Sequence, residues 1–593
     1  MNKGKIPHAL TIKWLRDMYI KRKITPMDVL SEIIHRVHQD AELNVWITPP
    51  SLERIQPFLD QLENMEPETS PLWGIPFAIK DNIDLAEVPT TAGCPEFSYT
   101  PTENATVVER LILAGAIPLG KTNLDQFATG LVGTRSPYGE TSNAFRPEMI
   151  SGGSSSGSAV AVARGHAAFA LGTDTAGSGR VPASLNNIIG FKPSCGAWPV
   201  KGVVPACASL DCVTVFTHRL DDALIVDSIV RGIDDKDPWS KKIPCPVPQT
   251  PEKIYLPKET LDFSGPFANE YSHAWDRAVS KLKTSHLQIE YVDTQLFSEA
   301  ASILYDGPFI AERWASLEDF IDTHPEAIFP VTKQVLQSGA SSKYDAPSVF
   351  RTLHKLQSMK LEVRKLLNNA VLVLPTCGGT WTRDQVRLNP IQTNSEMGRY
   401  TNHCNLLNLC AISVPAGFAA PDLPFGITFF SLSEQENLIF GMADLFFHDD
   451  EKNSKHFFSN EKKDTTLIAV CGLHMRGFPL EKQMHKFGAR FVREAMTARK
   501  YQLICLPTAP AKPGLMKKPK CGASIQLELW EMPLDQFGSF VASIPAPLGI
   551  GKIELEDGTE IPGFICEAYA ADNAKDITAS GGWKNASVSI DGN

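Results

Sequence analysis

The chain lacks any apolar run long enough to cross a membrane. A membrane-spanning helix needs about 20 consecutive apolar residues, and no window of this sequence approaches that length. The first residues, MNKGKIPHALTIKWLRDMYIKRK, also lack the apolar stretch that forms the core of a signal peptide. We therefore expect a cytoplasmic protein that does not act at a membrane.

An excess of basic charge is also missing. The 593 residues include 57 Lys and Arg against 67 Asp and Glu, which gives a net charge of −10. Surfaces that bind nucleic acid or anionic lipid carry a clear excess of Lys and Arg. We therefore expect a small-molecule ligand and no nucleic-acid partner.

The cysteines lack the spacing of a metal site. The twelve cysteines are scattered, and neither Cys207 with Cys212 nor Cys404 with Cys410 has the two-residue spacer typical of zinc ligands. Buried, reduced thiols are the expected state, with no bound metal. No internal repeat with a period of 20–50 residues is visible either, which excludes solenoids and propellers.

The length of the chain indicates more than one domain, because single domains usually hold about 100–200 residues. Apolar residues make up 43% and charged residues 21%, as in ordinary globular proteins. The segment FHDDEKNSKHFFSNEKKDTT, residues 447–466, is charged and has no periodicity, which is typical of a linker. We place a boundary near residue 460, between domains of residues 1–460 and 461–593.

The first domain alternates between strand and helix patterns. ITPMDVLSEIIHRVHQ begins a helix with Thr25 as N-cap, Pro26 at the first position and Asp28 completing a capping box. From residue 71 onward we expect the strand WGIPFAIKD, the helix ATVVERLILAGA, the strand IPLGK and the helix SAVAVARGHAAFA. This alternation predicts an α/β domain with a mainly parallel sheet.

The second domain is expected to be a smaller α+β unit. It begins with the strand pattern TTLIAVCG, continues with LEKQMHKFGARFVREAMTARK, which we predict as one helix, and returns to a strand at YQLICLP. Its remainder has β-like patterns with Gly and Pro turns.

GAIPLGKT, residues 115–122, formally matches the phosphate-binding loop of nucleotide-binding enzymes. That loop needs a strand before it, a helix after it and free backbone N–H groups around the phosphates. Here a helix pattern comes first, the spacer residues are apolar, and Pro118 has no N–H to donate. We predict a buried strand that carries Lys121 near its end.

Lys80 ends the strand pattern GIPFAIK, at the carboxyl edge where open α/β sheets carry their sites. Two interpretations remain open from the residues alone. An exposed Lys at a strand end would have no special role. A buried Lys would lose part of its affinity for the proton, because burial disfavours the charged form, and it would then suit the role of a base.

Two Ser/Gly clusters follow, SGGSSSGSAV at residues 151–160 and LGTDTAGSGR at residues 171–180. A helix expected from about Ser156 would direct its N–H groups toward the first cluster. In the second, Gly177 and Gly179 flank Ser178 and permit a tight turn whose N–H groups converge as an oxyanion hole. The alternative is that both clusters are simple turns.

IKDN around Lys80, SGGSSSGSA around Ser154, GTDTAGSGRVPAS around Ser178 and the following GFKPS resemble the amidase signature family of amide hydrolases. The resemblance is clear over about residues 70–200 and continues more weakly to about residue 440. It implies the amidase signature fold for the first domain, a large mixed and mostly parallel sheet between helical layers.

The sequence departs from the family pattern at two places. SSS at residues 154–156 precedes Gly157, where the family more often has SSGG, and Ala176 stands where Gly is common. Both changes are small, and neither removes a group that the resemblance implies to be catalytic.

The resemblance implies a Ser-Ser-Lys triad with Ser178 as nucleophile, Ser154 as bridging hydroxyl and Lys80 as base, acting through an acyl-enzyme. It also implies that a cis peptide holds Ser154, and it requires no metal or organic cofactor. Asp174 is expected to orient the turn rather than to act as an acid. The expected oxyanion donors are the N–H groups of Thr175, Ala176, Gly177 and Ser178.

DQFATGLVGTRSPYGETSNAF, TLIAVCGLHMRGFPLE and DITASGGW resemble, within that family, the allophanate hydrolases of urea degradation, which act alone or joined to a biotin-dependent urea carboxylase. The resemblance implies release of ammonia and CO2 from allophanate by a homodimer. Tyr305 and Arg313 match the pair that binds the substrate carboxylate, provided that the helix bends near Gly307. Alternatively, Arg313 pairs with Glu312 or Glu318.

Other functions remain open from the sequence. The chain could hydrolyse another small carboxylated amide such as malonamate, serve as one component of an aminoacyl-tRNA amidotransferase, or be an inactive scaffold. No biotin-attachment sequence is present, so we expect the carboxylase part to be absent from this chain. In the resembling enzymes the second domain is thought to act on the first product. His474 and Glu567 are its candidate polar groups, although we expect structural roles for both.

Overall fold

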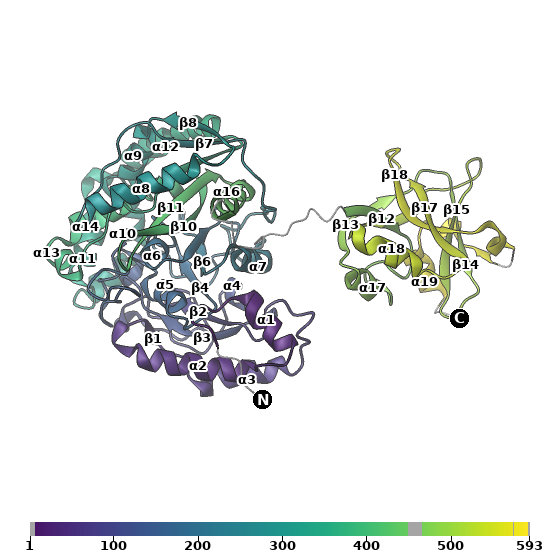
Figure 1. The fold of residues 1–593 in the computed structure, drawn as a ribbon, viewed down its shortest axis with the longest axis horizontal. Coiled ribbons are helices and arrows are strands. Elements are labelled where there is room, and N and C mark those ends of the chain that lie inside the picture. Colours follow the sequence, from purple (N-terminus) through teal and green to yellow (C-terminus); the bar gives the residue numbers. More distant parts are fainter. Residues whose placement is uncertain (1–5, 449–464, 573, 591–593) are drawn as a thin grey trace. The chain divides into compact units, whose positions relative to one another are not determined.

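The computed structural model describes residues 6–448, 465–572 and 574–590 (Figure 1). The chain divides into two compact units, Met1–Phe457 and Phe458–Asn593. The boundary expected near residue 460 and its linker segment lie almost entirely outside the described residues, so the domain limits 1–460 and 461–593 stay a prediction. Among the described residues, no helix has the length and apolar character needed to cross a bilayer.

One eleven-stranded sheet forms the centre of the first unit (Figure 1). Its strands lie in the order β1 (Trp46–Thr48), β3 (Ile117–Thr122), β2 (Pro76–Lys80), β4 (Phe169–Thr173), β6 (Val213–Thr217), β5 (Ile189–Lys192), β10 (Leu409–Ala420), β11 (Leu423–Leu432), β9 (Ala370–Pro375), β7 (Lys253–Pro257) and β8 (Gln288–Val292).

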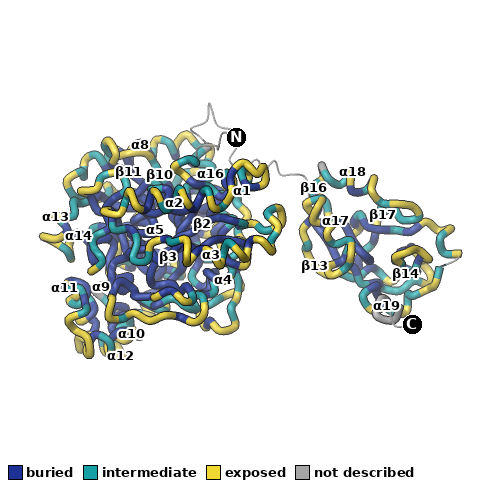
Figure 2. The backbone as a smooth tube through the Cα atoms, turned by 90° about the horizontal axis from the view of Figure 1, so that it is seen from below, coloured by how far each residue is buried: buried dark blue, intermediate teal, exposed yellow. Residues whose placement is uncertain are grey.

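Helices surround this sheet. They are α1 (Ile12–Ile20), α2 (Pro26–Gln39), α3 (Leu52–Leu62), α4 (Thr106–Leu113), α5 (Ser156–Ala163), α6 (Val181–Leu185), α7 (Leu220–Val230), α8 (Ala268–Leu282), α9 (Gln295–Asp306), α10 (Phe309–Thr323), α11 (Pro330–Gln337), α12 (Ala346–Leu367), α13 (Arg383–Leu388), α14 (Pro390–Gly398), α15 (His403–Leu406) and α16 (Glu436–His448). Every residue of β2, β3, β4, β6 and β9 is buried, so both faces of the central sheet are covered (Figure 2).

The expected mixed sheet between helices is confirmed, but the expected excess of parallel strands is not found. Parallel pairs join β2 to β3 and β4, and β7 to β8 and β9. The other neighbours, including β10 with β11 and β6 with both β4 and β5, are antiparallel. The direction of a strand relative to its neighbour depends on how the chain returns to the sheet. Two strands joined by a short connection pair antiparallel, because only a parallel pair needs a long crossover.

Local sequence signals place several elements of this unit correctly. The capping box at the start of α2 is present, with the Thr25 side chain accepting the Asp28 N–H and Asp28 accepting the Thr25 N–H. The phosphate-loop pattern forms the buried strand β3, as predicted. Lys121 on that strand is fully buried and pairs with Asp81 at 3.1 Å, so its charge serves an internal ion pair.

The second unit contains two smaller sheets. The five-stranded sheet has the order β13 (Arg490–Met496), β16 (Gln526–Pro533), β12 (Thr465–Val470), β18 (Glu560–Cys566) and β17 (Leu548–Glu554). The three-stranded sheet comprises β15 (Lys512–Lys517), β14 (Tyr501–Leu506) and β19 (Lys575–Asp576). The helices of this unit are α17 (Glu481–Lys486), α18 (Leu534–Ala542) and α19 (Trp583–Ile590).

The single helix predicted for residues 480–500 is wrong. Only α17 is helical, and the chain then turns at Gly488, whose φ of +71° lies in the left-handed region. After this turn β13 pairs antiparallel with β16. Gly is favoured at such a position because it has no Cβ to clash, and the strand that follows is stabilised by pairing that no local pattern contains.

A buried carboxylate holds the second unit together near its end. Glu528, on β16, is fully buried and accepts hydrogen bonds from the Arg476 backbone N–H and from the Trp530 indole. Arg476 Nε and Lys584 Nζ also contact Glu528, at 3.2 and 3.0 Å. Because Lys584 lies on α19, this one acid links the last helix to β16.

Candidate functional site

Lys80 ends β2 and lies beside the end of β4, because these two strands are parallel neighbours whose carboxyl ends meet. It is fully buried, which decides between the two interpretations left open by the sequence. Its Nζ donates hydrogen bonds of 2.7 Å to Ser154 Oγ and to Thr173 Oγ1. Asn82 Nδ2 contacts the same Thr173 hydroxyl at 3.3 Å.

Burial lowers the pKa of Lys80 to about 7, because a charged ammonium is poorly solvated inside the protein. The negative charges of Asp125, Asp211 and Asp174 oppose this shift without cancelling it. Close to neutral pH, a substantial fraction of the amine is therefore unprotonated and able to accept a proton.

The loop before α5 presents Ser154 to Lys80. The peptide bond between Gly153 and Ser154 is cis, and the Ser154 carbonyl accepts the Asp125 N–H at 3.1 Å. A Cβ on Gly153 would lie 2.1 Å from Asp125 Oδ2, so only glycine fits there. Asp125 in turn accepts the N–H groups of Gly133 and Arg135 at 3.0 and 2.9 Å, which ties two loops together under the serine.

The turn after β4 is built around the Asp174 carboxylate. Both of its oxygens are used: Oδ1 accepts the Gly177 N–H at 2.7 Å, and Oδ2 accepts the Gly179 N–H at 3.1 Å. The Arg180 guanidinium forms two further bonds to it, at 2.8 and 2.9 Å. The Arg180 charge keeps the pKa of Asp174 low despite burial. Asp174 therefore orients the turn, and both its oxygen atoms face structural donors.

Three backbone N–H groups of this turn remain open. Within the described part of the chain, no residue accepts a hydrogen bond from the N–H of Thr175, Ala176 or Ser178. The fourth donor expected from the sequence, Gly177, is directed to Asp174 instead, which removes it from the set. The Ser178 side chain is buried to 3% exposure, in the same turn as these open donors.

Two residues that the sequence did not single out fix the turn from outside. Asp211 accepts the Thr175 hydroxyl at 2.5 Å and the Ala206 N–H at 2.8 Å. Asn405 Nδ2 donates to the carbonyl groups of Asp174 and Leu210, both at 2.8 Å. Neither residue has a local motif, and each lies far from the turn in the sequence, so only the folded chain reveals them.

Tyr305 and Arg313 meet across the break between α9 and α10. The helices are interrupted at Gly307 and Pro308, as expected, and the Arg313 guanidinium lies 5.4 Å from the centre of the Tyr305 ring. Arg313 is 1% exposed. Its Nη1 contacts Thr129 Oγ1 at 3.4 Å, and its Nε has no hydrogen-bond partner among the described residues.

The alternative partners of Arg313 are not used. Glu312 accepts instead from the backbone and hydroxyl of Ser209, at 2.8 and 2.7 Å. In the part of the chain that the structure describes, no carboxylate forms an ion pair with Arg313. A buried positive charge without a negative partner is costly in free energy, and a guanidinium pairs most strongly with a carboxylate or another anion.

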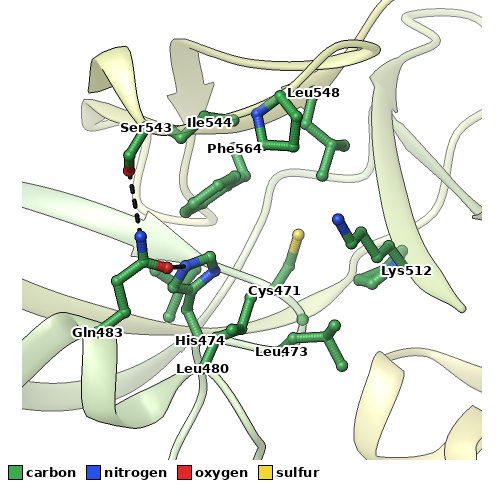
Figure 3. Close-up of a pocket in the computed structure, with 14 residues that line it drawn as sticks. Cys471, Leu473, His474, Leu480, Gln483, Lys512, Ser543, Ile544, Leu548 and Phe564 are labelled. Atoms are coloured by element: carbon green, nitrogen blue, oxygen red, sulfur yellow. Dashed lines mark hydrogen bonds between the residues drawn. The ribbon is translucent and has the colours of Figure 1, made fainter. Parts of the chain in front are cut away.

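The second unit has its own pocket, of about 60 Å³ (Figure 3). His474 stacks on Phe564 with 4.8 Å between ring centres, and its Nε2 is 2.9 Å from Gln483 Oε1. Burial lowers the pKa of His474, so it is neutral at pH 7. Lys512 and Cys471 also line the pocket, and burial raises the pKa of Cys471 to about 12.

Glu567 does not join His474 in this pocket. It is exposed, and it is not among the described residues that line the cavity. Its backbone caps a short turn, with its N–H donating to the Pro547 carbonyl at 2.9 Å. No group of three or more His, Cys, Asp or Glu side chains among the described residues is arranged to hold a metal ion.

Two family profiles match this sequence. The amidase profile matches residues 28–440, and the profile of the allophanate hydrolase C-terminal domain matches residues 466–587. The first covers the unit that contains Lys80, Ser154 and Ser178, and the second covers the unit that contains His474.

Known proteins are similar over most of the chain. Urea amidolyase of Saccharomyces cerevisiae is 40% identical over 572 residues, which cover 91% of this chain and 31% of the yeast protein. This chain thus spans less than a third of that relative. Kluyveromyces lactis allophanate hydrolase has a TM-score of 0.72 and 38% identity over 98% of this chain and 99% of that one. A glutamyl-tRNA(Gln) amidotransferase component of Thermoanaerobacter pseudethanolicus is 31% identical, covering 76% of this chain and 98% of that protein.

The charge state of Lys80 gives a prediction that needs no substrate. A serine-directed fluorophosphonate should label Ser178 faster as the pH rises through about 7, since the folded-state pKa of Lys80 is lowered to that value and only its neutral form accepts a proton. The rate should level off above pH 8 or so. Lys80→Met should label slowly and without this pH dependence, as measured by mass spectrometry of the intact protein. Equal labelling of both proteins would contradict the role of Lys80.

Proposed function

Because the chain belongs to the amidase family and carries the C-terminal domain of allophanate hydrolases, we propose that it hydrolyses the amide of allophanate, releasing ammonia, in urea degradation. The observation that carries the choice of substrate is the buried Arg313, which has no carboxylate partner among the described residues. Allophanate is a short amide with one carboxylate, and it would supply the missing negative charge.

The first step uses the triad as a proton path. Neutral Lys80 takes a proton from the Ser154 hydroxyl, to which it is joined by a 2.7 Å hydrogen bond. Ser154 takes a proton from Ser178 as the Ser178 oxygen attacks the amide carbon. Thr173 keeps the Lys80 ammonium in place once it is charged, through the second 2.7 Å bond.

The open N–H groups then stabilise the tetrahedral intermediate. Those of Thr175, Ala176 and Ser178 are available for the negative oxygen, and Asp174 and Asp211 hold the turn in shape around them. The proton held by Lys80 returns through Ser154 to the nitrogen, ammonia leaves, and an acyl group remains on Ser178. Water, activated by the same pair, hydrolyses this ester and frees the enzyme.

The substrate carboxylate lies against Arg313 in this proposal. A planar guanidinium binds a carboxylate through two parallel hydrogen bonds, and the free Nε supplies one of the required donors. The Tyr305 ring covers one face of the guanidinium and holds it in place. Malonamate has a carboxylate and an amide in a similar arrangement, so it is the natural competitor to test beside allophanate.

We further propose that the second unit acts on the first product. Hydrolysis of allophanate leaves an N-carboxylated carbamate, a dianion that must lose CO2. The pocket beside His474 is small, and the Lys512 side chain is directed into it, so a positive charge faces the space (Figure 3). The hydrogen bond from Gln483 to Ser543, at 3.1 Å, fixes the amide that orients His474.

The yeast relative is much longer than this chain, which suggests where the substrate comes from. Since this chain spans 31% of that urea amidolyase, we propose that a separate or attached biotin-dependent urea carboxylase supplies its allophanate. The homodimer expected from the family resemblance stays a prediction.

Ser178→Ala should abolish catalysis while leaving the fold intact. Without the nucleophilic oxygen no acyl-enzyme forms, so ammonia release from allophanate should fall about 1000-fold or more. Ammonia should be measured in parallel from allophanate and malonamate, with circular dichroism as the control for folding. Wild-type turnover by this variant would overturn the assignment of the nucleophile, and faster release from malonamate would overturn the choice of substrate.

Arg313→Lys should weaken substrate binding. Lysine keeps the positive charge but loses the planar pair of donors, so KM for allophanate should rise about 10- to 100-fold. Arg387→Lys is the matched control, because Arg387 is an exposed arginine that pairs with Glu140 on the surface, and its KM should not change. An unchanged KM in Arg313→Lys would contradict the carboxylate site.

His474→Ala should separate the two products in time. Ammonia release should continue, since it depends on the first unit, while CO2 should appear more slowly than ammonia. Both gases are followed in one stopped assay, and Glu567→Gln serves as a control at an exposed acid of the same unit. If CO2 keeps pace with ammonia in His474→Ala, the second unit has a purely structural role.

A further inference from the structure

A third buried lysine, besides Lys80 and Lys121, lies at the end of β5. Lys192 is fully buried, and its Nζ donates to the Pro193 carbonyl at 2.8 Å. Its other contact is a thiol, Cys195 Sγ, at 3.9 Å. Among the described residues, no carboxylate forms an ion pair with this ammonium. A buried cation of this kind favours a negative charge close by, and Cys195 is the ionisable group that it contacts.

Two cysteines, Cys195 and Cys212, lie near Lys192 and Pro193. Cys212 Sγ contacts the same Pro193 carbonyl at 3.4 Å, and Cys195 Sγ contacts the Leu210 carbonyl at 3.7 Å. Each thiol therefore contacts the segment that carries the other cysteine. As a residue, Cys195 is partly exposed, whereas Cys212 is buried, so Cys195 is the one of the two that lies nearer to solvent.

The pKa values of the two thiols are shifted in opposite directions. The hydrogen bond from Cys212, together with the positive charges of Lys192 and Lys241, lowers the pKa of Cys195. Burial and the interaction with Cys195 raise the pKa of Cys212. A thiolate beside a protonated thiol is the arrangement that reacts first with peroxides and then closes to a disulfide.

The segment that carries Cys212 also holds the catalytic turn. The Cys212 carbonyl accepts the Asp174 N–H at 2.8 Å. Asn405 bridges the carbonyl groups of Asp174 and Leu210, and Asp211 accepts the Thr175 hydroxyl. Any displacement of residues 210–212 therefore changes the position of the turn that presents Ser178.

We propose that Cys195 and Cys212 form a redox-active thiol pair, which hydrogen peroxide oxidises to a disulfide and which thereby switches off the neighbouring catalytic turn. The Cys195 thiolate attacks one peroxide oxygen, so that an S–O bond forms, the O–O bond breaks and hydroxide leaves. The Cys212 thiol then attacks the sulfenic sulfur. An S–S bond forms, the S–O bond breaks, and the departing hydroxyl leaves as water with the Cys212 proton. The two electrons lost by the sulfur atoms reduce the peroxide, and an added dithiol reverses the change.

The disulfide is tested directly on the full-length protein. After treatment with hydrogen peroxide and tryptic digestion without reductant, residues 181–201 and 202–219 should appear as one linked peptide, because trypsin spares the bond between Lys192 and Pro193. Ammonia release from allophanate should fall about tenfold, since a displaced catalytic turn costs at least this much, and dithiothreitol should restore it. The activity measurement rests on the proposed function, whereas the linked peptide does not.

Matched variants identify the sulfur atoms. Cys207→Ser, in the same peptide as Cys212 but with a buried thiol whose pKa is raised, should still give the link, and Cys212→Ser should not. Lys192→Met should slow its formation, because the thiolate loses the adjacent charge. The proposal is overturned if no linked peptide forms under conditions that oxidise the exposed Cys245, or if Lys192→Met links as fast as the wild type.

Discussion

The burial of the Lys80 ammonium is the constraint on which the rest of the site depends. Its two hydrogen bonds go to hydroxyl groups, those of Ser154 and Thr173, and not to a carboxylate. A paired carboxylate would hold the proton on the amine at neutral pH, whereas hydroxyl partners let burial lower the pKa to about 7. The negative charges of Asp125, Asp211 and Asp174 make this decrease in the pKa of Lys80 smaller. The surrounding loops, with the glycine at residue 153, serve to bring one serine to this amine.

The acids around the turn act on backbone geometry rather than on chemistry. Asp174 uses both oxygens on the N–H groups of its own turn and on Arg180. Asp211 accepts the Thr175 hydroxyl with one oxygen and the Ala206 N–H with the other. Each buried charge is fully hydrogen bonded, which is the condition under which a buried carboxylate stabilises a unique conformation. Only the donors that these acids leave unused are free for a reacting oxygen.

Local patterns in the sequence predicted several features of the first unit. Thr25 and Asp28 indicated a capping box, Gly307 and Pro308 indicated the break between two helices, and Lys80 could be placed at a strand end. The motif residues were found through family resemblance, and the fold then showed their positions. Contacts between segments that are distant in the sequence could not be predicted, such as the contact of Asn405 with the turn that contains Asp174. The antiparallel pairings and the strand after Gly488 were missed for the same reason, because they depend on partners elsewhere in the chain.

The interruption between α9 and α10 has a consequence for engineering. The arm that presents Tyr305 and Arg313 belongs to helices whose register is set by Gly307 and Pro308, and it shares no covalent segment with the turn that carries Ser178. In the proposed function, the residues that bind the substrate carboxylate therefore lie on a different segment from the residues that cleave the amide. If substrate selection is to be changed without altering the turn that carries Ser178, residues 301–315 are the segment that the proposed function singles out for substitution.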